Sequence, residues 1–109
     1  MSFSFKKGTF VKQATSGNQA VTGVGFVPKA IILFTTDKDQ SAEGFLINAA
    51  TSWGWATSTT ERRAVVAVSQ DNVGTSVTGV RISNTKVIVQ VFPNTGNLAN
   101  QADFVSFDS

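Results

Sequence analysis

The feature that most limits the possible folds is the spacing of apolar residues along the chain. Short apolar or alternating runs are separated by Gly, Asn, Ser and Thr about every eight to twelve residues, a spacing typical of an all-β sandwich or barrel. No stretch keeps the three- and four-residue spacing of an amphipathic helix. The pattern therefore predicts an all-β fold with about seven to nine short strands.

Three apolar runs of strand length are the candidate core. Residues 30–34 are apolar without a break, which predicts a central strand covered on both faces. Residues 64–68 follow the same pattern, and residues 87–92 are rich in β-branched side chains. Further strands are expected at residues 3–11, where the strand is bent or bulged, and at residues 19–26, 44–48, 51–57, 77–82 and 103–107.

The length and the missing residue types narrow the class of protein. With 109 residues the chain has room for one ordinary domain, so we expect a single antiparallel β-sandwich, jelly-roll-like, over residues 1–109. Cys, His and Tyr are absent. Their absence excludes Ser-His-Asp and Cys-His nucleophile systems and zinc sites built from Cys or His. We expect no enzymatic activity and no cofactor.

Few residues are charged. Nine Lys and Arg and seven Asp and Glu give a net charge of +2 and a charged fraction of 15%, against about 25% in average soluble domains. Neutral polar residues take their place, and such surfaces suit subunit contacts because charged residues are depleted at interface cores. No run approaches the roughly 18 apolar residues of a membrane helix, and no signal peptide is visible. We expect no membrane insertion and no export by a visible signal.

One loop, residues 36–43, is dense in charge. Its carboxylates Asp37, Asp39 and Glu43 suggest a calcium loop built from side-chain oxygens. The match to an EF-hand fails, because Ala42 stands where that loop needs glycine and Asn48 stands where it needs a bidentate glutamate. Neighbours on one loop also rarely face each other across a cleft as a glycosidase pair does. We therefore favour a solvated loop without a metal ion.

A second candidate site is formed by two tryptophans. Trp53 and Trp55 are two residues apart, so an extended segment places both indoles on one face. Such a pair can stack on sugar rings. The favoured alternative is that the rings pack over the sheet or at a subunit contact, since Trp is enriched at interfaces.

A third candidate is a nucleic-acid surface. Basic and aromatic residues alternate loosely at Phe3, Phe5, Lys6, Lys7, Phe10, Lys12, Arg62 and Arg63, as in proteins that bind single strands. The charge surplus of +2 is small for this function. Lysines on an edge strand, where they discourage stray pairing, explain the same residues. We expect no nucleic-acid partner.

Several strings together resemble a known class of module. Residues 23–30 read Gly-Val-Gly-Phe-Val-Pro-Lys-Ala and continue as Ile-Ile-Leu-Phe to residue 34. Residues 8–10, 15–19, 53–57, 69–72 and 101–108 fit the same pattern. The chain thereby resembles a β-sandwich module of structural proteins in tailed bacteriophages and prophages. The resemblance implies a virion component of the tail, fibre or head surface, made in the host cytoplasm, with no catalytic motif.

The resemblance also implies partners. They are other copies of the chain, in a homotrimer by analogy with phage spikes and capsid decoration proteins, and capsid or tail proteins of the virion. The alternative function is a receptor-binding tail module that holds a host glycan on Trp53 and Trp55. In such modules the stretch matching residues 105–108 leads into further strands. Either these strands are missing after residue 109, or a neighbouring subunit completes the sheet.

Overall fold

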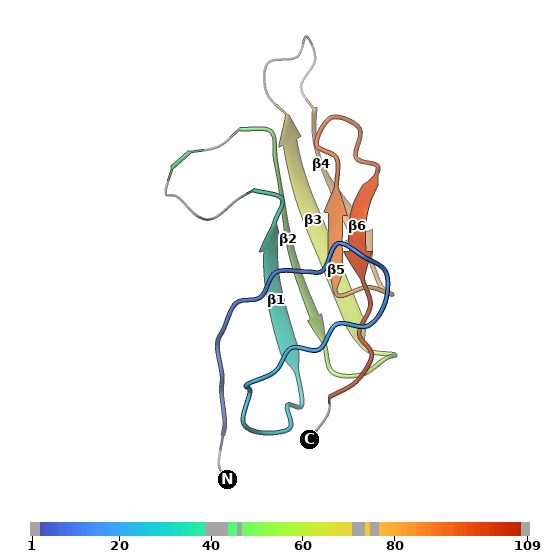
Figure 1. Cartoon of the computed structure of the whole chain (residues 1–109). Coiled ribbons are helices and arrows are strands. Elements are labelled where there is room, and N and C mark those ends of the chain that lie inside the picture. The colour runs from blue at the N-terminus through green and yellow to red at the C-terminus, as the bar shows by residue number, and fades with distance from the viewer. Residues whose placement is uncertain (1–2, 39–43, 46, 71–73, 75–76, 108–109) are drawn as a thin grey trace.

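The computed structural model describes residues 3–38, 44–45, 47–70, 74 and 77–107. The regular elements among these residues are all strands, which confirms the all-β class (Figure 1). There are six of them, fewer than predicted: β1 (Ile31–Thr36), β2 (Ala49–Ala56), β3 (Arg62–Gln70), β4 (Val77–Ser83), β5 (Ile88–Val91) and β6 (Leu98–Ala102).

The strands make two antiparallel sheets. The larger has the order β1-β2-β3-β4 and the smaller is the β5-β6 hairpin. Strand β5 packs mainly against β2 and β3, and in Figure 1 the hairpin lies in front of the larger sheet. The arrangement is sandwich-like. Neighbours in each sheet are neighbours in sequence, so the jelly-roll connectivity that we predicted is not confirmed.

The core lies between the two sheets. On β2 and β3 every second side chain points inward and is buried, and these inner residues are Ala50, Ser52, Ala56, Ala64, Val66 and Val68. All four residues of β5 are buried above them. The predicted core run at residues 64–68 is therefore confirmed for its inward-facing side chains. The run at residues 87–92 is confirmed for Val87 and all of β5, whereas Phe92 is 53% exposed.

The inner residues of β2 are small because the hairpin comes very close. Gly54 points inward, and a Cβ built on it would overlap the carbonyl oxygen of Val87 and lie 2.8 Å from the carbonyl carbon. Neither atom belongs to a flexible side chain, so no rotamer change makes room. Glycine at position 54 is thus a condition for the two layers to pack at this distance.

The prediction for residues 30–34 is wrong in one respect. They do form a strand, β1, but it lies at the edge of the sheet and not at its centre. Ile31 and Leu33 pack partly against the core, whereas Ile32 and Phe34 are 68% and 73% exposed. An apolar run shows that both faces of a strand are apolar; it does not show that both faces are covered.

Residues 3–30 form no strand, so the strands predicted at residues 3–11 and 19–26 are wrong. Local hydrogen bonds hold part of this segment. The Gln13 backbone N–H donates to Gln19 Oε1 (2.8 Å), and Gln19 Nε2 donates to the carbonyl of Val11 (2.7 Å). Gly23 and Gly25 have φ values of 81° and 85°, which breaks an extended ladder. In Figure 1 the segment, drawn in blue, crosses in front of the β5-β6 hairpin.

Two further predicted strands, at residues 44–48 and 103–107, are wrong, because none of their described residues lies in a strand. Residues 47–48 precede β2 and are not part of a strand, and Asn48 has a φ of 55°. The last strand is β6 rather than residues 103–107. The hairpin before β6 closes with a turn in which the Gly96 N–H donates to the carbonyl of Phe92 (2.8 Å), and Gly96 has a φ of 71°. These local conformations set where the strands begin.

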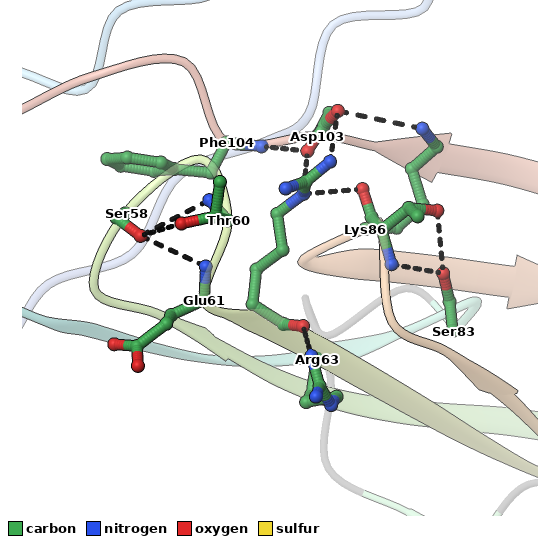
Figure 2. A network of polar contacts seen from close by, with 10 residues as sticks. Ser58, Thr60, Glu61, Arg63, Ser83, Lys86, Asp103 and Phe104 are labelled. Atoms are coloured by element: carbon green, nitrogen blue, oxygen red, sulfur yellow. Dashed lines mark hydrogen bonds and ion pairs between the residues drawn. The ribbon is translucent and has the colours of Figure 1, made fainter.

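A polar network anchors the end of the hairpin to the larger sheet (Figure 2). Arg62 Nε lies 2.6 Å from Asp103 Oδ1 and donates to the carbonyl of Thr85 (2.7 Å). The Phe104 N–H donates to Asp103 Oδ1 (2.8 Å), and Lys86 Nζ lies 3.7 Å from Asp103 Oδ2. Asp103 therefore connects β3, the β4-β5 connection and the chain after β6.

Candidate binding surface on the outer face of the sheet

The larger sheet has a second face, which the hairpin does not cover. Because antiparallel partners project to the same side, the strand register aligns the outward residues in rows. One row crosses all four strands: Phe34 pairs with Trp53, Trp53 with Val65, and Val65 with Ile82. Every side chain in this row is apolar.

The rows on either side extend the apolar area. Ile32 pairs with Trp55, and Ala67 pairs with Val80. We call the outward apolar residues of the three rows the outer face, and they are Ile32, Phe34, Trp53, Trp55, Val65, Ala67, Val80 and Ile82. Only Val65 is half-buried; the other seven are exposed. A monomer rarely leaves so many adjacent large apolar side chains in water, so this face is the best candidate for a binding surface.

The two tryptophans lie on one face of β2, as their two-residue spacing predicts. Trp53 and Trp55 both project outward and are 58% and 42% exposed. The ring of Phe34 stacks on Trp53 with a centroid distance of 6.1 Å and an interplanar angle of 27°. The indoles are thus absent from the core between the sheets and form an aromatic strip with Phe34.

Gly54 explains why both indoles are displayed. Alternate residues of a strand project to opposite faces, so the inward Gly54 forces both of its neighbours outward. The space under β5 admits no Cβ at this position. The packing of the two sheets therefore fixes the direction of Trp53 and Trp55.

The outer face carries little charge. Among the outward positions of β1 to β4 that the structure describes, Arg63 is the one ionisable side chain, and it pairs with Trp55 in an end row. Covering this face would therefore desolvate one charge at most. The chemistry favours an apolar partner surface over a polar small molecule or an ion.

The carboxylate loop is only partly described. Asp37 Oδ1 accepts a hydrogen bond from the Ala50 N–H (3.0 Å), and Asp37 Oδ2 lies 3.8 Å from Lys38 Nζ. Asp39 and Glu43, the other two candidates, lie outside the described residues. Within the described ranges no group of three His, Cys, Asp or Glu side chains comes together. Asp37 has a structural role, since it ties the end of β1 to the start of β2.

The basic candidates are spread over different parts of the fold. Lys6 and Lys7 lie in the segment that forms no strand. The prediction that they occupy an edge strand is therefore wrong. Lys12 Nζ donates to the carbonyl of Gln13 (3.1 Å). Arg62 and Arg63 are adjacent on β3 and so project to opposite faces, Arg62 toward Asp103 and Arg63 outward.

The sequence predicted the tryptophan pair but missed most of the outer face. Ile32 and Phe34 were assigned to the core, and Val80 and Ile82 were assigned no role. Their alternation with inward residues is a usable signal, but only once the covered face of each strand is known.

The comparisons with known proteins assign this chain to no family. No family model matches the chain, and no curated protein or solved structure shows significant similarity to it. In the part of the chain that the structure describes, no helix is long and apolar enough to span a membrane. The resemblance to phage structural modules stays a prediction.

Proposed function

We propose that this protein is a structural module of a virion that assembles by binding further copies of itself through the outer face. One observation carries the proposal: the outer face presents the aromatic strip of Phe34, Trp53 and Trp55 to solvent on a rigid sheet. Aromatic side chains are enriched at the energetic centres of protein interfaces.

The size of the face supports a specific contact. Four strands about 4.8 Å apart span about 14 Å, and the three rows span about 13 Å along the strands. Removing apolar area from water contributes about 25 cal/mol per Å². A patch of several hundred Å² on a small monomer is commonly functional.

A second copy is the partner that fits best. Outer faces of neighbouring copies that meet around a shared axis bury apolar side chains against apolar side chains. Arg63 lies in an end row, and two copies can turn it to the wet rim of the interface. The low charge of the whole chain keeps electrostatic repulsion between copies small.

The virion setting and the homotrimer are proposed on the resemblance stated above. A decoration or tail protein repeats one modest contact many times on a particle, and avidity then replaces the affinity of any single contact. Capsid or tail proteins are the proposed scaffold. Locating the protein on particles by electron microscopy distinguishes the head from the tail.

The test of self-assembly is sedimentation velocity of the whole chain at micromolar concentrations. We expect an oligomer for the wild type and a monomer for Trp53→Lys. The matched control is Leu98→Lys, which also places a lysine on an exposed strand residue but lies on β6. A wild-type chain that stays monomeric at about 100 μM would sink the proposal, since contacts weaker than about 5 kcal/mol do not sustain a specific oligomer.

Host glycan binding is the second candidate function, because Trp53 and Trp55 are exposed on one side of one strand. A glycan array on the whole chain tests it. The glycan proposal expects bound sugars that Trp53→Ala with Trp55→Ala removes without a change in far-UV circular dichroism. An array with no bound sugar would contradict this alternative and leave self-assembly unaffected.

A further inference from the structure

We propose that residues 3–11 of one copy, the N-terminal arm, add as a fifth strand to the free edge of β1 in a neighbouring copy. The inference rests on the proposed self-assembly and names its partner segment. Two features carry it: an edge strand without protection, and an exposed arm that pairs with no strand and carries Phe3 and Phe5.

The edge of β1 is open. In the described sheets β1 pairs with β2 alone, so its other side presents unpaired backbone N–H and C=O groups. Its sequence Ile-Ile-Leu-Phe-Thr-Thr holds no charge and no proline, and its pairing with β2 runs without a bulge. Natural edge strands are normally protected by such devices, and an unprotected one is a template for another strand.

The arm has alternating apolar residues at its start and pairs with no strand of its own chain. All nine residues of the arm are exposed and lie outside every strand. Phe3 and Phe5 alternate with Ser4 and are 89% and 76% exposed. Nine extended residues reach about 30 Å, which exceeds the roughly 20 Å of the six-residue β1.

The spacing of the arm matches the outer face. If Ser4 stands opposite Leu33, Phe3 and Phe5 lie beside Ile32 and Phe34, whether the two strands run parallel or antiparallel. The two phenylalanines then extend the aromatic strip to a fifth strand. Stable interfaces bury about 800 Å² on each partner, and the bare outer face, about 14 by 13 Å, supplies only part of this area, so the added strand enlarges the contact.

The neighbouring copy is the acceptor for a structural reason. One chain carries both the arm and the open edge, and the two are unpaired within it. Donation from copy to copy is a head-to-tail contact, which closes into a ring when the rotation allows. A ring of three satisfies every arm and every edge, in agreement with the proposed trimer.

The test uses a disulfide in a chain that has no natural cysteine. The variant Ser4→Cys with Leu33→Cys is oxidised at micromolar concentration and run on a non-reducing denaturing gel. We expect covalent dimers and trimers that disappear on reduction. Each single-cysteine variant is the control and must give far less of these species. A disulfide within one chain, seen as a shifted monomer band, overturns the inference; the absence of any disulfide does so when the exposed pairs described next also fail.

Leu33 packs partly in the core, so a failure of the Leu33→Cys variant to fold must be separated from a failure to cross-link. Two further double variants therefore use exposed acceptor residues. Phe5→Cys is combined with Ile32→Cys for an antiparallel arm and with Phe34→Cys for a parallel arm; both acceptor residues are exposed. One pair must cross-link chains, and failure of both overturns the inference. If Trp53→Lys still dissociates the wild-type oligomer, the proposed function survives that failure; a monomeric wild type removes both.

Discussion

The inner and outer faces of the larger sheet are built from the same strands but from opposite kinds of side chain. The inner face of β2 holds Ala50, Ser52, Gly54 and Ala56, all buried, whereas its outer face holds two exposed indoles. In a monomer the usual expectation is the reverse, with the bulky aromatic residues inside. The small inner residues admit the hairpin at close range, and the aromatic mass is left for a surface that another molecule can cover.

This contrast separates the free energy of unfolding of one chain from the free energy of association between chains. Stability of the monomer should depend on the inner face, and association should depend on the outer face. Substitutions on alternate residues of a single strand therefore report on different equilibria, and three predictions examine this division.

The largest effect on stability is expected at the closest approach of the layers. Gly54→Ala places a methyl group against the backbone of Val87, and we expect a loss of at least about 3 kcal/mol in the free energy of unfolding. Urea unfolding followed by circular dichroism measures it. Gly79→Ala is the matched control, because Gly79 also lies on an inward position of the sheet but a Cβ there meets nothing within 4 Å. Equal stability of the two variants would contradict the close contact between Gly54 and the backbone of Val87.

A smaller difference is expected between two valines of neighbouring strands. Val66 is fully buried on the inner face, and Val66→Ala should cost about 2 kcal/mol. Val80 is 67% exposed on the outer face, and Val80→Ala should change the stability of the monomer by less than about 0.5 kcal/mol. Both are measured by urea unfolding at concentrations too low for association. Similar costs would mean that the outer face is covered within one chain.

The smallest effect is expected at the polar anchor of the hairpin. Asp103→Asn removes the charge that Arg62 and Lys86 face, and we expect a cost of about 1 kcal/mol because Asp103 is partly exposed. The cost should shrink as salt is raised. Thermal unfolding at low and high salt measures both. A loss that does not respond to salt would contradict an electrostatic role of Asp103, because an asparagine side chain keeps an oxygen that can accept from the Phe104 N–H.

The sequence alone predicted those strands and turns whose own residues favour that structure. β-Branched residues predicted β5, the alternation around Trp53 and Trp55 predicted a strand with both indoles on one side, and the turn residues placed the breaks. The position of β1 at the edge was beyond reach, since an apolar run does not state what covers it. The missing strand at residues 3–11 has the same cause: a strand needs a pairing edge, and the sequence does not name one. The overlap at Gly54 depends on Val87, 33 residues away, and is a property of the tertiary structure alone.

The close packing at Gly54 also disfavours misaligned pairing of β2 with its neighbouring strands. If β2 slid by one residue during folding, an indole would have to occupy a space that rejects even a methyl group, while the small residues would turn to solvent. Such a chain gains no core and stays unfolded. The close contact at Gly54 thereby disfavours any alignment of β2 that would bury its tryptophans.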